Sequence, residues 1–319
     1  MTTNNHLLED ANLYQKADLA LLDFTTNGKL LPQVAQQFLE IAVGATRLLP
    51  LASVPPMSSN EARIDTIEFQ GYILRPGVEG EALPIGDRVK PTAGGATVVT
   101  KEFIAEVRMS YNTLEDTIER KNFQAKLVDM LGRKVGYDME YTVVNSDTAY
   151  VGPYKALKLF DGIRKLAVSH TVDIGGAPLD EDQILKIVKK LDNKYQQNPA
   201  QLKILTSPKA KLDYAHRAFI SRGTPLGDSA LTRPVPVTYV DREVVDVPAF
   251  PENLGGGTNE TEAIYCDPKN VTVGMWREVA IELDKDISAR QLIIVATFRM
   301  GCNYANEDGV VKGYGITIS

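Results

Sequence analysis

The chain of 319 residues has little of what catalytic and metal sites are usually built from: two cysteines, three histidines and one tryptophan. Cys266 and Cys302 do not form a C-x-x-C pair, and no histidine stands in an H-E-x-x-H spacing, so no zinc site is predicted. Two cysteines are also too few for a disulfide framework, which favours synthesis in a reducing compartment. We expect both cysteines to be small buried residues rather than ligands.

Long apolar runs and an excess of basic residues are absent as well. Residues 41–54 are the most apolar stretch, but Arg47 and Pro50 interrupt it, and a spanning helix needs roughly 18 apolar residues. The first residues do not combine a cationic region with an apolar one, so neither a signal peptide nor a membrane span is predicted. With 35 Lys and Arg against 41 Asp and Glu, the net charge of −6 argues against a basic nucleic-acid track as the main surface.

Catalytic motifs are missing too. The sequence contains no G-x-x-x-x-G-K-[ST] and no G-x-S-x-G. The glycine run at 255–257 lacks the strand and helix of a phosphate cradle, so a loop is predicted there. His170 lies at the edge of an apolar run and is expected to be a hydrogen-bonded structural residue rather than a general base. We therefore predict that the chain is not an enzyme and that it binds neither a cofactor nor a metal.

The first 60 residues have the pattern of an arm rather than of a domain. Residues 31–45 place Val34, Phe38 and Ile41 at roughly helical spacing, and residues 48–56 are apolar but interrupted by prolines. A stretch this short cannot enclose a core of its own. Its apolar side chains are therefore expected to dock on something else.

The next segment contains an unusually long loop. Ile67, Phe69 and Ile73 lie in one β-prone run, and residues 103–109 alternate as a second strand. Between these runs lie 21 residues, 75–95, with five glycines and three prolines. Loops of this length are usually functional or disordered, and a two-stranded ribbon is marginal alone in water. We expect the loop to lie on a neighbouring molecule; the alternative is a solvated, disordered tip. Its charged residues are the candidates for that contact: Arg75, Glu79, Glu81, Asp87, Arg88 and Lys90.

A long helix and a mixed α/β region follow. Residues 113–116 resemble a capping box, and Phe123, Leu127, Leu131 and Val135 are spaced by four in a helix predicted to run over 122–145, about 36 Å long. From about residue 154 the pattern becomes mixed. It predicts helices over 182–196 and 209–217, the latter opened by a Ser-Pro pair, and strands over 202–205, 235–240, 263–266, 271–275, 279–283 and 292–300. The class predicted is α+β.

Four short motifs occur in a familiar order. Residues 107–116 (V-R-M-S-Y-N-T-L-E-D) open the long helix, and 143–147 (V-V-N-S-D) close it. Residues 204–208 (I-L-T-S-P) and 223–227 (G-T-P-L-G) lie in the mixed region. In this order and spacing they resemble the major capsid protein of tailed double-stranded DNA bacteriophages, the HK97 fold. The likeness spans roughly residues 60–319.

The resemblance implies an HK97-like capsid fold and an allocation of domains. Residues 1–60 would be the N-arm, 61–106 the E-loop and its flanking strands, and 107–153 the P-domain with its spine helix. Residues 154–278 would form the A-domain, and 279–319 the strands that return to the P-domain. Such a subunit self-assembles as hexamers and pentamers into an icosahedral capsid that encloses double-stranded DNA without sequence-specific binding. The E-loop charges would then be inter-subunit contacts.

The resemblance also implies partners and a location. No long coiled coil precedes residue 60, so a separate scaffolding protein is expected, together with a portal protein and, in some members, decoration proteins. The protein would be part of the virion and assembled in the host cytoplasm. Two alternatives stay open: an encapsulin-type compartment shell, against which the long N-terminal arm argues, and a soluble oligomeric enzyme, against which the missing catalytic motifs argue.

Overall fold

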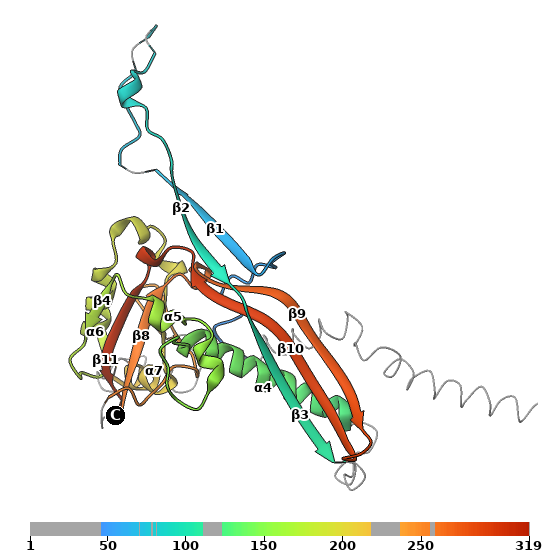
Figure 1. Cartoon of the computed structure of the whole chain (residues 1–319). Coiled ribbons are helices and arrows are strands. Elements are labelled where there is room, and N and C mark those ends of the chain that lie inside the picture. Colours follow the sequence, from blue (N-terminus) through green and yellow to red (C-terminus); the bar gives the residue numbers. More distant parts are fainter. Residues whose placement is uncertain are drawn as a thin grey trace, which may run out of the picture. The chain divides into compact units, whose positions relative to one another are not determined.

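The computed structural model describes residues 46–69, 71–77, 79–80, 82–110, 123–217, 237–255 and 259–318 (Figure 1). The helix predicted at 31–45, the capping pattern at 113–116 and the loop at 223–227 lie outside these residues. The chain divides into two compact units. One contains the described parts of Glu102–Gly136 and Arg277–Arg299, and the other contains those of Thr46–Lys101, Tyr137–Trp276 and Met300–Ser319.

The first unit is built on a three-stranded sheet in the order β3-β10-β9. These strands are β3 (Lys101–Ser110), β9 (Val271–Asp286) and β10 (Gln291–Tyr304), and the last two continue into the second unit. Successive side chains of a strand point to opposite faces. Phe103 and Phe298 stack with ring centroids 5.3 Å apart on the buried face, whereas Glu102 accepts from Arg299 at 3.0 Å on the other. The two strands predicted at 271–275 and 279–283 are one continuous strand.

The long helix α4 (Phe123–Asn145) is confirmed and ends at the predicted residue. Leu131, Val135 and Met139 recur at intervals of four and are buried. This spacing keeps them on one face of the helix. Packing of that face stabilises the helix although its overall amphipathicity is weak and it contains two internal glycines. The helix belongs to the first unit as far as Gly136 and to the second beyond it.

The second unit contains a six-stranded mixed sheet in the order β4-β11-β8-β5-β7-β6. Strand β11 pairs parallel with β4 and antiparallel with β8, and β5 pairs parallel with β7 and antiparallel with β8. The strands are β4 (Thr171–Asp173), β5 (Lys203–Thr206), β6 (Thr238–Tyr239), β7 (Arg242–Asp246), β8 (Glu260–Cys266) and β11 (Val311–Thr317).

The second unit also contains short helices. They are α5 (Ile163–Leu166), α6 (Glu181–Lys190) and α7 (Pro208–Ala215), with the single-turn helices η2 (Lys155–Lys158), η3 (Asn193–Tyr195), η4 (Pro199–Gln201), η6 (Pro268–Asn270) and η7 (Glu307–Gly309). Ser207 caps α7 by accepting from the Ala210 N–H, as the Ser-Pro pair predicts. Ile184 and Ile187 of α6 are fully buried in the core of this unit.

Helix α6 is shorter than the predicted 182–196. It ends at Lys190, and Leu191 takes an extended conformation. The Gln196 side-chain amide donates to the carbonyls of Val188 and Leu191, at 3.1 and 2.7 Å. A side chain from beyond the helix therefore satisfies carbonyl groups at its end. Tyr195, the last residue of the predicted apolar pattern, lies in η3 instead of α6.

Two strands, β1 (Glu61–Glu68) and β2 (Thr92–Val99), form an antiparallel ribbon that carries a long loop at its far end (Figure 1). The expectation that residues 103–109 close this ribbon is wrong, because that segment is β3 of the three-stranded sheet. The closing strand includes Gly94 and Gly95, which the sequence analysis assigned to the loop. A Cβ on Gly95 would lie 2.7 Å from the Arg63 Nε of the paired strand, so the glycine leaves room for that side chain.

Candidate interaction surface

Groups that could support catalysis are inaccessible or scattered in the part of the chain that the structure describes. Cys266 and Cys302 are buried, as predicted; burial raises the pKa of the Cys266 thiol to about 12 and also raises that of Cys302. His170 differs from expectation at Nδ1, which is buried without a hydrogen-bond partner. The described residues contain no group of three or more His, Cys, Asp or Glu side chains placed to hold a metal ion. Among them, no helix combines the length and apolarity needed to cross a membrane.

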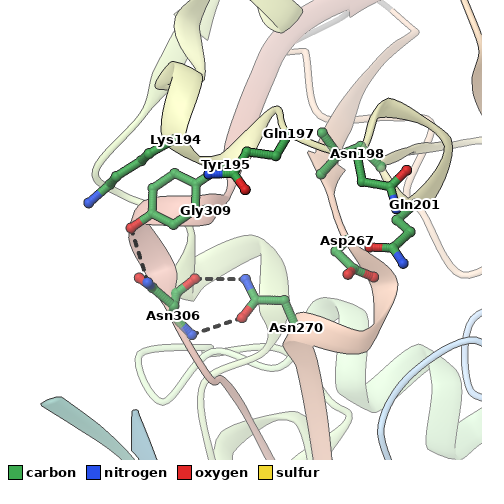
Figure 2. Close-up of a pocket in the computed structure, with 10 residues that line it drawn as sticks. Lys194, Tyr195, Gln197, Asn198, Gln201, Asp267, Asn270, Asn306 and Gly309 are labelled. Carbon is green, nitrogen blue, oxygen red and sulfur yellow. Dashed lines mark hydrogen bonds between the residues drawn. The ribbon is translucent and has the colours of Figure 1, made fainter. Parts of the chain in front are cut away.

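A polar hollow of about 380 Å³ opens on the second unit, beside η3, η6 and η7 (Figure 2). Two of the amides that line it, those of Asn270 and Asn306, are engaged in hydrogen bonds with neighbouring groups. Asn270 Nδ2 donates to the Asn306 carbonyl at 2.7 Å, its Oδ1 accepts from the Asn306 N–H at 2.8 Å, and Asn306 Nδ2 donates to the Tyr195 hydroxyl at 3.0 Å. These groups tie three turns together, and we assign no ligand to the hollow.

The ribbon and the loop at its end present a group of exposed apolar side chains that are close together in sequence, whereas Val151 and Ile287, at 90% and 83% exposed, stand apart from it in the sequence. Leu74 is 92% exposed, Tyr72 90% and Ile85 81%. The single-turn helix η1 (Ile85–Asp87) within the loop contains no buried residue. We call the following seven side chains the apolar tip: Ile67, Phe69, Tyr72, Ile73, Leu74, Leu83 and Ile85. Exposed apolar clusters of this kind mark interaction sites in proteins.

The charged residues predicted for this loop are only partly brought together. Arg75 Nε lies 3.7 Å from the Asp87 carboxylate, and Arg88 Nε donates to the Leu83 carbonyl at 3.1 Å. Glu79 and Lys90 are exposed, whereas Glu81 lies outside the described residues. Arg75, Asp87 and Arg88 thus make contacts inside the loop itself.

The apolar tip was not predicted from the sequence as a site. Ile67, Phe69 and Ile73 were predicted to lie in a strand, and Tyr72, Leu74 and Ile85 were not among the predicted site residues. A usable signal was present, because large apolar residues are unusual in a segment so rich in glycine and proline, which cannot bury them locally.

The segment that precedes the ribbon is anchored by a buried carboxylate, which the sequence analysis also missed. Glu140 of α4 is 1% exposed, and its Oε2 accepts from the N–H groups of Arg47, Leu48 and Leu49 at 2.9, 2.6 and 3.4 Å. Burial raises the pKa of Glu140, and these hydrogen bonds oppose the rise. The chain then bridges to β9 at Ser53 before it enters β1. The residues that follow the described N-terminal boundary are therefore held firmly to the second unit.

Comparisons with known proteins agree with one another. No family model matches the chain. It is 31% identical, over 96% of its length and 98% of the relative's, to a Bacillus subtilis (strain 168) protein named "Putative prophage capsid protein YqbE". Its structure resembles that of the satellite phage P4 procapsid, with a TM-score of 0.66 at 11% identity over 99% of both chains.

Two further solved structures have a similar fold. The capsid of a native GTA particle matches with a TM-score of 0.60 at 15% identity, over 87% of this chain and 91% of its own. The SrpI encapsulin of Synechococcus elongatus PCC 7942 matches with a TM-score of 0.58 at 11% identity, over 85% and 88%. At such identities these likenesses concern the fold.

Proposed function

This chain belongs to the family of bacteriophage capsid proteins, and from that premise we propose how it assembles. It has the mixed α and β, HK97-like capsid fold that its sequence motifs predicted, and it is a capsid subunit of a phage particle. We propose that copies of it associate as hexamers and pentamers into a closed icosahedral shell around double-stranded DNA, which the shell encloses without sequence-specific binding.

The observation that carries this proposal is the apolar tip. Tyr72, Leu74 and Ile85 are more than four-fifths exposed, and burying a large apolar side chain stabilises by about 1.5–3 kcal/mol. A ribbon that has no core of its own gains this free energy only on another molecule. In a shell made of one kind of subunit, the neighbouring copy supplies that surface. We assign the apolar tip as the anchor of this contact and the six charged residues around it as its polar rim.

The allocation of domains follows the family pattern. We propose residues 1–60 as the N-arm, 61–106 as the E-loop with its flanking strands, and 107–153 with 279–319 as the P-domain. Residues 154–278 form the A-domain, around which the copies of a pentamer or hexamer meet. The boundary at 106 deserves revision within this scheme to about residue 100, since β2 ends at Val99 and β3 begins at Lys101.

Further partners are proposed on the same basis. A separate scaffolding protein would guide assembly, a portal protein would occupy one vertex, and decoration proteins are optional. Assembly would take place in the host cytoplasm and end in the virion. The related proteins are named for a structural role, and we propose that this subunit, like them, works without catalysis.

An encapsulin-type shell is the second candidate, because an encapsulin is among the proteins of similar fold. The two functions differ in what they need for assembly. An encapsulin subunit would close into small shells by itself, whereas a phage subunit is expected to depend on a scaffolding protein.

Negative-stain electron microscopy tests the proposal. The protein would be purified after expression alone and after co-expression with its neighbouring reading frames. Closed shells, or rings of five and six subunits, are expected, and shells that require co-expression favour the virion over the encapsulin. A uniform monomer or dimer under every condition would overturn the proposal.

A further inference from the structure

The base of the ribbon lies against two glycines, one on each strand of the β9–β10 hairpin. A Cβ on Gly301 of β10 would lie 2.2 Å from the Val99 carbonyl oxygen and 2.9 Å from its carbonyl carbon. A Cβ on Gly274 of β9 would lie 2.3 Å from Met57 Sδ and 2.9 Å from Val98 Cγ1. A side chain at position 301 would have to displace the backbone of the ribbon, whereas one at position 274 would have to displace the Met57 side chain and the Val98 methyl group.

The same base is fixed by hydrogen bonds and burial. Asn303, two residues after Gly301, donates from Nδ2 to the Thr97 carbonyl at 2.8 Å. Thr100 donates from its N–H to the Asn60 carbonyl at 2.9 Å, which ties the ends of the two ribbon strands to each other. Val98 and Thr100 are 1% and 2% exposed. Beyond this base, the ribbon and its loop are mostly exposed, so the base is where the direction of the ribbon is determined.

We propose that Gly301 and Gly274 are positioning residues for assembly: they seat the ribbon so closely on the hairpin that they set the direction in which it leaves the body, and hence where its tip meets the neighbouring subunit. The proposal rests on the proposed function, because it presumes that the tip contacts another copy. It adds a site that acts on the geometry of the shell without itself touching the neighbour.

The ribbon amplifies small changes at its base. Each strand has eight residues, so the paired part is about 26 Å long. A tilt of roughly ten degrees at the base would therefore move the far end of the strands by about 5 Å. That is comparable to the spacing between neighbouring strands, and enough to change the angle at which two subunits meet. The two glycines differ in how they would respond to substitution, because Gly301 faces backbone whereas Gly274 faces side chains.

The test compares Gly301→Ala and Gly274→Ala with Gly77→Ala, a matched control in the loop whose Cβ would meet nothing within 4 Å. Each full-length variant would be assembled under the conditions that give wild-type shells, and particle diameters would be measured by electron microscopy. We expect Gly301→Ala to give shells of altered diameter or open sheets, and Gly77→Ala to give wild-type shells. Shells of wild-type diameter from both Gly301→Ala and Gly274→Ala would overturn the proposal.

A rescue separates positioning from a loss of stability. Met57→Ala removes the closest contact of position 274 and leaves only the Val98 methyl group at 2.9 Å, so it is expected to shift the diameters of Gly274→Ala shells back towards the wild-type value. If Gly301→Ala fails to fold, this pair decides the question. A Gly274→Ala variant that is merely less stable, with shells of unchanged size and no response to Met57→Ala, would contradict the proposal.

A distance measurement on the unassembled subunit is independent of shell formation. Both native cysteines are buried, so spin labels on Glu79→Cys in the loop and Lys158→Cys on η2 report on the ribbon selectively. Gly301→Ala is expected to shift the label distance by about 5 Å, whereas Gly77→Ala leaves it unchanged. If the wild-type protein forms no shells, the proposed function fails, but the distance shift still tests whether Gly301 positions the ribbon. If shells form and neither the label distance nor the shell diameter changes in the variants, only the positioning role of the two glycines is overturned.

Discussion

The unit that contains the six-stranded sheet buries its large apolar side chains, whereas the loop at the end of the ribbon exposes them. In the sheet unit, Leu179 and Ile187 are fully buried in a shared core, and Arg164 lies 2.6 Å from Glu262 with both side chains largely covered. In the loop, Leu74 is 92% exposed and the Arg75–Asp87 pair is open to solvent. The sheet unit contains the partners of its apolar residues, whereas the loop lacks them. Under the proposed function, folding and assembly therefore depend on different residues of one chain.

Deleting residues 84–91 should separate the two regions most sharply. The deletion removes η1, three of the predicted contact residues (Asp87, Arg88 and Lys90), and Ile85 of the apolar tip. We expect the sheet unit to keep its thermal unfolding transition and the protein to lose shell assembly entirely. Normal shells from the deletion variant, seen by electron microscopy, would show that the loop does not carry the contact.

A matched pair of leucines gives the next largest contrast. Leu179→Ala should lower the free energy of unfolding by about 3 kcal/mol, since it opens a cavity in the core, whereas Leu74→Ala should change it by less than about 0.5 kcal/mol. Shell yield should respond in the opposite sense: Leu74→Ala is expected to reduce it several-fold at equal folded concentration. Urea unfolding and sedimentation of assembled particles measure the two effects. Equal destabilisation by both variants would contradict the division of roles.

The buried Glu140 tests whether the segment before the ribbon belongs to the stable region. Because burial raises the pKa of Glu140 in the folded state, the folded protein binds the proton more tightly than the unfolded chain does. Stability from this group therefore increases as pH falls from neutral through the raised pKa towards 4.5, and is lost as pH rises. The gain is on the order of 1 kcal/mol for each unit between the two pKa values.

Urea unfolding of wild type and Glu140→Gln at several pH values between 4.5 and 7 measures this dependence. As the pH falls, the free energy of unfolding of the wild type should increase relative to that of Glu140→Gln. Glu61→Gln, at an exposed position on β1, is the control and should show no such trend. A flat difference for Glu140→Gln would mean that its carboxylate is not desolvated in the folded protein.

Much of the stable region could be predicted from local sequence. The spacing by four in α4, the Ser207-Pro208 start of α7 and the apolar runs of β5 and β8 express the periodicities that bury one face of an element. The single-residue joint at Thr100 could not be predicted, because β2 and β3 read as one β-prone run and their different partners are set by long-range pairing. Gly94 and Gly95 were predicted to lie in the loop for the same reason, because a glycine that leaves room for a cross-strand side chain has the same local pattern as a loop glycine.

The sequence predicted roughly where the candidate interaction surface lies, but not which side chains form it. Length, glycine and proline content placed the loop at residues 75–95, whereas the segment between β1 and β2 runs from 69 to 91. The charged residues were predicted as the contacts because exposed charges are what a solvated loop usually carries. Arg75, Asp87 and Arg88 contact other groups of the loop. Only the structure showed that Tyr72, Leu74 and Ile85 stay exposed, since their burial depends on tertiary neighbours that sequence spacing does not encode.

The smallest expected effect comes from the charges of the loop. Replacing Glu79 together with Glu81 by lysine should leave the free energy of unfolding unchanged, because Glu79 is exposed and has no role in the core. Shell assembly should be impaired, but less than by Leu74→Ala, since exposed ion pairs contribute only about 0.2–1 kcal/mol each. The impairment should shrink at high salt, where charges at the rim are screened, whereas the effect of Leu74→Ala should persist. Light scattering of assembly at low and high ionic strength distinguishes them. A double charge reversal that abolishes assembly at every salt concentration would reverse the ranking of apolar anchor over polar rim.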